Sequence, residues 1–369
     1  GAQTDLVMLP LELLGRDWAE RWGSLPAEVG EDPTRQWFCS AMFLFVSTVV
    51  RQVDFEVVAP LALVHCVRAM AHADLFRQDT QEYRALCLNV VEQGSEDAGF
   101  RDALFQALRE FHEALIASSG GEGSDRASWA HLACLHFLLG VLACPALIDA
   151  EPFFPAVWPV IIDCIAAVDP KREERGTLAI RAHGLAGVCL GQVGAADRPE
   201  MVREYLSSSS GALERDPRED IGKAFAVTTE TLMKDIGTQC SGGAADPEAL
   251  GLQRWVLHEL GSSVLENLRE GRAGVAEGLF KVLCGASLYV HPQYLPYPFY
   301  RESRLHTILT RHEPMRDLWL RHLIARASEA SREVLTRCLL DDFPEQAAAY
   351  PESAAAGRPR GGSTLRSAL

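Results

Sequence analysis

The sequence lacks any apolar run long enough to cross a lipid bilayer. Its longest such run, Trp37 to Val50, spans 14 residues and includes Ser40, Ser47 and Thr48, whereas a transmembrane helix needs about 20 predominantly apolar residues. No leader pattern is recognisable at the N-terminus. We therefore expect no membrane insertion and a cytoplasmic location, with the nucleus as the alternative.

The cysteines are not spaced as they are in metal-binding motifs. Ten cysteines are scattered along the chain, and none forms a CxxC pair. In the segment HLACLH, His131 and Cys134 would share one helical face, whereas His136 would point away from it. No second cluster supplies further ligands, so a structural role is the favoured interpretation. We expect no metal site and no cofactor.

Positive charge is sparse, and so are motifs that bind nucleotides. The net charge is −15, which argues against nucleic acid as the main partner. Neither GxGxxG nor GxxxxGK[ST] is present. The glycine-rich segment GVCLGQVG, residues 187–194, closes a predicted helix where a phosphate site would open one. It is expected to serve helix packing and a helix C-cap.

What the chain does have is helical periodicity, and no stretch alternates with the period of a strand. The clearest segment, residues 155–192, predicts two helices. The first has one apolar face, with Pro155 and Pro159 in or near its first turn. Proline cannot continue a helix and biases the residue before it away from helical angles, so Asp169 and Pro170 predict a corner. The apolar face is formed by Val157, Ile161, Ile165 and Val168.

The second helix of this segment returns with its own apolar face. Its small residues Gly184, Gly187 and Gly191 would let a neighbouring backbone approach closely. One hairpin cannot bury both of its apolar faces, so it implies neighbours on either side. The predicted face of the second helix consists of Leu178, Ala182, Leu185 and Cys189. Other helices are predicted at about 34–52, 54–73, 79–92, 96–117, 129–142, 199–215, 216–236, 248–270, 272–290, 301–311, 314–327 and 329–340. The helix at 96–117 has the clearest amphipathic pattern, with one apolar stripe formed by Phe100, Leu104, Leu108, Phe111 and Leu115.

This segment resembles a HEAT or armadillo-type repeat, in which an apolar helix, an Asp-Pro corner, charged residues and an Ala/Leu-rich helix follow one another. Its motif VDPKREERG is also similar to a segment in scaffold subunits of the Triple-T co-chaperone complex, a family that serves phosphatidylinositol-3-kinase-related kinases. The residues that carry this narrower resemblance are Asp169, Pro170, Lys171, Arg175 and Gly176. The resemblance implies an irregular α-solenoid of antiparallel helix pairs.

Corner signals recur about every 30–50 residues, as in irregular helical repeats. We expect one α-helical repeat domain over residues 1–350, with a subdivision near 118–125 or 240–247 as the alternative. Residues 351–369 are of low complexity and are predicted to be a disordered tail.

A Tyr/Pro-rich stretch near residue 294 predicts a partner-binding surface. Prolines at 292, 296 and 298 would hold this segment extended, which lowers the entropy lost on binding. Aromatic side chains with polar tips favour interfaces. The alternative is a loop packed against the helices. The candidate residues are Tyr294, Tyr297, Phe299, Tyr300, Arg301 and Arg304.

We therefore expect a non-enzymatic scaffold for protein–protein interactions, such as a co-chaperone or complex-assembly subunit. One alternative is an all-α enzyme with a buried pocket, in which DDFPE at 341–345 would hold a metal ion through Asp341 and Asp342. A third is a transport adaptor that binds cargo with the same architecture. The oligomeric state is left open by the sequence.

Overall fold

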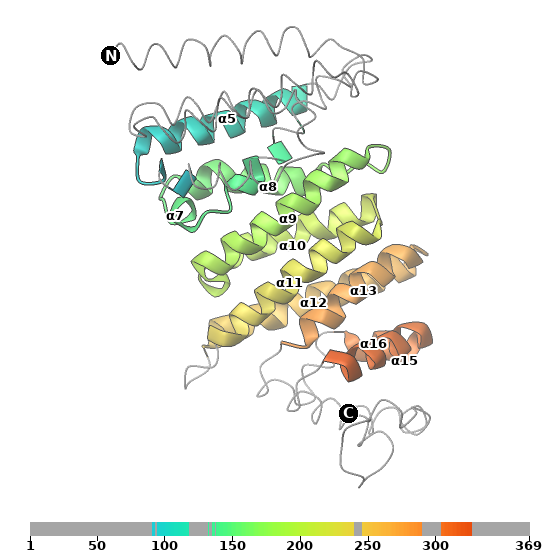
Figure 1. The fold of residues 1–369 in the computed structure, drawn as a ribbon. Helices are drawn as coiled ribbons and strands as arrows, with labels where there is room; N and C mark the ends of the chain where they lie inside the picture. The colour runs from blue at the N-terminus through green and yellow to red at the C-terminus, as the bar shows by residue number, and fades with distance from the viewer. Residues whose placement is uncertain are drawn as a thin grey trace, which may run out of the picture. The chain divides into compact units, whose positions relative to one another are not determined.

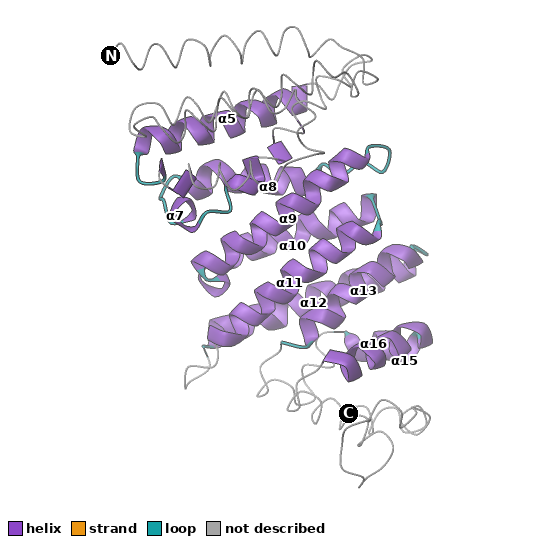
Figure 2. Cartoon of the chain, viewed as in Figure 1, coloured by secondary structure: helices purple, strands orange, loops and turns teal. Residues whose placement is uncertain are grey.

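The structure, a computed structural model, describes residues 91–92, 94–117, 132, 135–136, 138–239, 246–289 and 304–326. These ranges are mostly helical, and none of their residues belongs to a strand (Figure 2). The all-α class predicted from the periodicity is confirmed for this part of the chain. The chain divides into two compact units, Gly1–Gln192 and Val193–Leu369, and each is described by itself below.

The first unit is built on two neighbouring helices that share an aromatic contact. The ring of Phe105 meets that of Phe153 edge-on, with centroids 5.8 Å apart, and so joins α5 to α8 (Figure 1). The contact is in the range in which aromatic pairs add stability beyond their buried area. The described helices of this unit are α5 (Ala98–Ala117), α7 (Pro145–Ile148), α8 (Phe153–Ala166) and α9 (Glu173–Val193).

The apolar faces predicted for these helices are buried. On α5, Phe111 is only half-buried, while the other members of its predicted stripe are in the core. Removing such side chains from water is the main stabilising contribution to folding. The buried residues of the predicted faces are Phe100, Leu104, Leu108, Leu115, Val157, Ile161, Ile165, Val168, Leu178, Ala182, Leu185 and Cys189.

The predicted Asp-Pro corner joins α8 to α9. The carboxylate Oδ1 of Asp169 accepts a hydrogen bond from the backbone N–H of Lys171 at 2.9 Å. The backbone carbonyl of Asp169 accepts another from the N–H of Arg172, also at 2.9 Å. A short carboxylate that bonds the backbone two residues ahead stabilises a turn. The first helix therefore ends at Ala166, and the second begins at Glu173.

Two expectations about this segment are corrected. Pro159 lies inside α8, past its first turn, and the helix continues through it, although proline removes one backbone hydrogen bond there. Gly184 and Gly191 are exposed, and a Cβ at either position would have no described atom within 4 Å. These two glycines therefore do not serve a close approach within the described part of the chain. The predicted helix C-cap is confirmed, because Gly194 directly follows α9 with φ 78°.

The second unit contains a series of longer helices with α13 packed against both α11 and α12. Tyr205 of α10 meets Phe225 of α11 edge-on at 5.9 Å between centroids. No described helix of the chain is both long and apolar enough to span a membrane. The elements are η4 (Ala195–Asp197), α10 (Pro199–Arg215), α11 (Glu219–Gln239), α12 (Pro247–Arg269), α13 (Ala273–Ser287), α15 (Leu305–Arg311) and α16 (Glu313–Arg326).

A polar corner holds α12 and α13 together. Gly271 has φ 76°, a left-handed conformation that favours glycine and ends α12. The buried side-chain amide of Asn267 donates a hydrogen bond to Oε1 of Glu214 in α10 at 3.2 Å. Arg272 lies 3.5 Å from the other carboxylate oxygen of Glu214 and also pairs with Glu270. The corner is thus tied to a third helix by one shared carboxylate.

Candidate docking pocket between α5, α8 and α9

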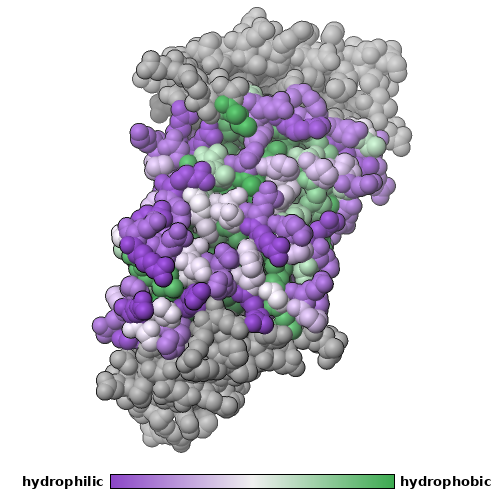
Figure 3. All heavy atoms as spheres, turned by 180° about the vertical axis from the view of Figure 1, so that it is seen from behind, coloured by the Kyte–Doolittle hydropathy of each residue, from purple (hydrophilic) through white to green (hydrophobic). Residues whose placement is uncertain are grey.

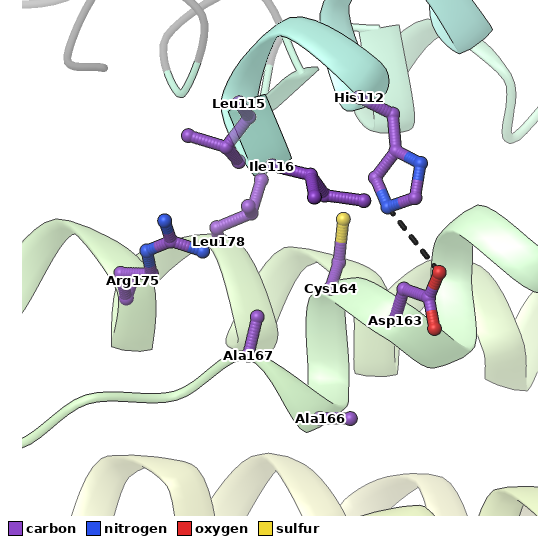
Figure 4. A pocket seen from close by; sticks show the side chains of 9 residues that line it. All are labelled: His112, Leu115, Ile116, Asp163, Cys164, Ala166, Ala167, Arg175 and Leu178. Carbon is purple, nitrogen blue, oxygen red and sulfur yellow. Dashed lines mark ion pairs between the residues drawn. The ribbon is translucent and has the colours of Figure 1, made fainter. Parts of the chain in front are cut away.

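Three helices of the first unit enclose a pocket of about 270 Å³. In Figure 4, side chains from α5, α8 and α9 converge on one small space. Its rim is open to solvent, because Ile116 is 58% exposed and the Asp163 side chain is 58% exposed. The lining residues are His112, Leu115, Ile116, Asp163, Cys164, Ala166, Ala167, Arg175 and Leu178.

Each helix brings both apolar and polar side chains to the pocket. On α5, His112 continues the row that Leu104 and Leu108 form at every fourth position, so the imidazole emerges at the edge of the apolar face. On α8, Asp163 is the one acidic residue between Phe153 and Ala166. The pocket is consequently apolar in the middle and polar at its ends.

At one end of the pocket, His112 Nε2 lies 3.4 Å from Asp163 Oδ2 (Figure 4). Burial lowers the pKa of His112, although the carboxylates of Asp163 and Glu113 act in the opposite direction. The imidazole is therefore neutral at physiological pH. Since a neutral imidazole carries no charge, it does not cancel the negative charge of the exposed Asp163 carboxylate.

The thiol of Cys164 lies between the two ends of the pocket. Burial, with the nearby Asp163 carboxylate, raises the pKa of Cys164 to about 12. The reactive form of cysteine is the thiolate, so this thiol is protonated and inert at neutral pH. It contributes polarizable apolar surface to the pocket.

Arg175 forms the cationic end of the pocket, opposite Asp163 in Figure 4. It is only 8% exposed although it carries a guanidinium. Burial lowers the pKa of Arg175, and the charge of Arg172 lowers it further, while Cys164 and Asp169 act against this. Arginine still keeps its charge at neutral pH. The pocket therefore presents a cation at one end and a carboxylate at the other.

The partner-binding residues predicted from the sequence are mostly not covered by the described ranges. Tyr294, Tyr297, Phe299, Tyr300 and Arg301 lie outside them. Arg304, the remaining member, is exposed and precedes α15 with φ 61°, a left-handed conformation that is strained for a side chain other than glycine. The structure thus leaves the Tyr/Pro surface as a prediction.

The candidate metal ligands are covered only in part as well. Asp341 and Asp342 of DDFPE, and His131 and Cys134 of HLACLH, lie outside the described residues. His136 is described and is half-buried. Within the described ranges, no group of three or more His, Cys, Asp or Glu side chains could hold a metal ion.

The pocket itself was not identified from the sequence as a site, although a signal was present. The sequence places Arg175 in the repeat-like motif, and Leu115 and Leu178 on apolar faces. The signal was the imidazole of His112 at the edge of the apolar face of α5 and the single carboxylate of α8, Asp163. Each pattern is local to one helix, and the sequence does not show that the two side chains meet across about 50 residues.

Some apolar side chains stay in contact with water elsewhere on the described surface. From behind, this surface is mostly hydrophilic and is interrupted by apolar areas (Figure 3). Val227 of α11 is 63% exposed and Val188 of α9 is 41% exposed. Single exposed apolar residues are common on soluble proteins, so only Ile116, which borders a pocket, is assigned a binding role here.

In the part of the chain that the structure describes, the fold is all-helical and has a small, water-accessible pocket of mixed polarity. Comparisons with protein-family models, with curated proteins and with solved structures found no match to this chain.

Proposed function

We propose that this chain is a non-enzymatic helical-repeat scaffold that binds protein partners, and that its helix pairs continue as an irregular solenoid. The short corners at Asp169–Arg172 and at Gly271 support this proposal, since each turns the chain back into another amphipathic helix. Helix pairs of this kind are stable when neighbours cover their apolar faces, and such arrays offer extended binding surfaces.

The pocket between α5, α8 and α9 is the observation that carries the proposal. Protein interfaces obtain most of their affinity from a few side chains that anchor in well-packed pockets. This pocket has apolar walls, and Ile116 extends the apolar surface beyond its rim. A cavity of about 270 Å³ is smaller than most small-molecule sites, which measure about 300–1,000 Å³. A side chain from a partner is therefore the better match.

The Tyr/Pro segment is proposed as a second contact area, with Tyr294, Tyr297, Phe299, Tyr300, Arg301 and Arg304 as its residues. A chain that binds partners both at the pocket and at the Tyr/Pro segment could act as a complex-assembly or co-chaperone subunit. The repeat resemblance implies the same kind of role. We place this activity in the cytoplasm, with the nucleus as the alternative.

Affinity purification of the tagged full chain, followed by mass spectrometry, tests the proposal. The wild-type chain is expected to enrich a reproducible set of proteins. A triple variant with Tyr294→Ala, Tyr297→Ala and Arg304→Ala is expected to lose part of that set. Lys223→Ala, at an exposed position of α11, is the control and should keep it. No enrichment by the wild-type chain would overturn the scaffold function.

A further inference from the structure

We propose that the pocket between α5, α8 and α9 receives one large apolar side chain of a protein partner, flanked by an acidic residue on the Arg175 side and a basic residue on the Asp163 side. This inference rests on the proposed scaffold function and names the partner chemistry of the same site. It is carried by the volume of the pocket and by the opposite charges at its two ends.

The apolar side chain is required by the middle of the pocket. The apolar lining residues are Leu115, Ile116, Leu178, Ala166 and Ala167. The two alanines leave room that longer side chains would fill. Burying apolar surface is favourable by about 25 cal/mol per Å², so a Leu-, Ile- or Phe-sized side chain entering the pocket gains affinity there.

An acidic neighbour suits the Arg175 side of the pocket, because Arg175 is the cation among the lining residues. Its guanidinium is largely removed from water, with the charge of Arg172 acting against its own and Asp169 acting in its favour. Guanidinium and carboxylate also match in shape and can form two parallel hydrogen bonds.

The basic neighbour is required by Asp163. Because His112 is neutral, the 58% exposed carboxylate of Asp163 keeps an uncompensated negative charge at the rim. A lysine or arginine of the partner can reach it from solvent. The charges of Arg175 and Asp163 therefore determine which charged residues flank the apolar side chain of the partner and in which direction the partner segment binds.

Synthetic peptides and the purified full chain test this proposal directly. Each labelled peptide carries a central leucine with Glu and Lys three or four residues to either side, which places them on one helical face. Two mixed-charge peptides are used, one with Glu before the leucine and Lys after it, and one with the reverse order. Two further peptides carry Glu at both positions or Lys at both positions. In a last peptide, alanine replaces the leucine. The expected result is binding by a mixed-charge peptide and at least about tenfold weaker binding by the alanine peptide.

Charge reversal supplies the sharper readout. Asp163→Lys is expected to weaken the mixed-charge peptide and to strengthen the peptide with two Glu, by about threefold or more each. Glu151→Lys makes the same charge change at an exposed position that does not line the pocket, and it should leave both affinities unchanged. Equal behaviour of the two variants would overturn the charge assignment.

A substitution that fills the pocket tests whether the peptide binds there or on another surface. Ala167→Phe is expected to reduce peptide binding by about tenfold or more. If this variant fails to fold by circular dichroism, Ile116→Glu at the exposed rim replaces it, with the same expectation. Unchanged binding in the folded variant would place the peptide elsewhere and overturn the proposal.

Two further results distinguish this inference from the scaffold function. If no peptide binds, and Asp163→Lys enriches the same cellular proteins as the wild-type chain, the pocket assignment is wrong and the scaffold function stands. If the wild-type chain enriches no proteins, the scaffold function itself is wrong. Binding of hexanoate, without binding of any peptide, would identify a small-molecule carboxylate site in place of a protein-docking site.

Discussion

The side-chain Nε2 of Gln253 lies 3.2 Å from the backbone carbonyl oxygen of Tyr289, to which it donates a hydrogen bond. The same amide donates a second bond to the carbonyl of Met233, also at 3.2 Å. Gln253 belongs to α12, Met233 to α11, and Tyr289 follows α13. One side chain that is 1% exposed therefore joins three segments of the second unit.

Replacing this amide should destabilise the second unit. Gln253→Leu removes both hydrogen bonds, each worth about 1 kcal/mol net, so we expect the free energy of unfolding to fall by about 2 kcal/mol. Urea denaturation followed by circular dichroism measures the change. Gln192→Leu is the control, because the amide of Gln192 bonds the exposed carboxylate of Asp149 and should contribute less than about 0.5 kcal/mol. Equal effects would contradict the assigned role of Gln253.

Two glycines near this contact should respond to alanine with opposite signs. A Cβ at Gly237 would lie 3.0 Å from the carbonyl oxygen of Tyr289 and 3.3 Å from Nε2 of Gln253. We expect Gly237→Ala to cost about 1–2 kcal/mol, because a backbone group cannot swing aside. Gly251→Ala, on an exposed face of α12 where no described atom lies within 4 Å, should stabilise by about 0.5–1 kcal/mol. Thermal unfolding of both variants checks the prediction.

Acid should destabilise the chain through a buried histidine. His183 of α9 is fully buried, and burial lowers its pKa to about 3. As pH falls below about 6.5, this residue gains a proton in the unfolded state but not in the folded state, so stability is lost by about 1.4 kcal/mol per pH unit. The loss continues down to about pH 3.

Measurement of unfolding free energy between pH 7 and pH 5 isolates this effect from most carboxylates. His183→Leu should make the pH dependence shallower. Some slope should remain, because burial also lowers the pKa of His112 and acts in the same direction. A wild-type slope in His183→Leu would contradict the prediction.

A substitution at Arg304, whose backbone is strained, tests protein stability and partner binding separately. Arg304 has φ 61°, which costs about 1 kcal/mol for a residue with a Cβ and little for glycine. Arg304→Gly is therefore expected to raise the unfolding free energy slightly, while it weakens partner capture if Arg304 contacts a partner. Arg311→Gly, at the last residue of α15 and without a left-handed backbone, should not raise the unfolding free energy. A stabilised Arg304→Gly variant with unchanged capture would remove Arg304 from the partner surface.

Much of the local structure was predictable from the sequence, and Asp169 illustrates why. The position of the corner follows from Pro170, which cannot continue a helix, and from a short carboxylate that bonds the backbone two residues ahead. Apolar spacing likewise identified the buried faces of α5, α8 and α9. The apolar face predicted for this helix extends to Val168, two residues beyond the end of α8 at Ala166, because helix ends depend on the turn that follows as well as on the apolar face.

The pocket could not be predicted in the same way. His112 and Asp163 are about 50 residues apart, and their 3.4 Å contact exists only because α5 packs on α8. The same holds for the close position of Gly237 next to Tyr289. The exposed state of Gly184 and Gly191 also depends on which neighbours a helix has, and no property of α9 alone decides it.

For the described residues, the sequence by itself determined the helical class, the corner at Asp169 and Pro170, and the buried faces of α5, α8 and α9, because helix formation and apolar periodicity act within a few residues. Only the tertiary structure decided which polar side chains meet, how much water each one loses, and where a pocket stays open. These properties arise between helices, since burial and electrostatic interactions depend on distances in space.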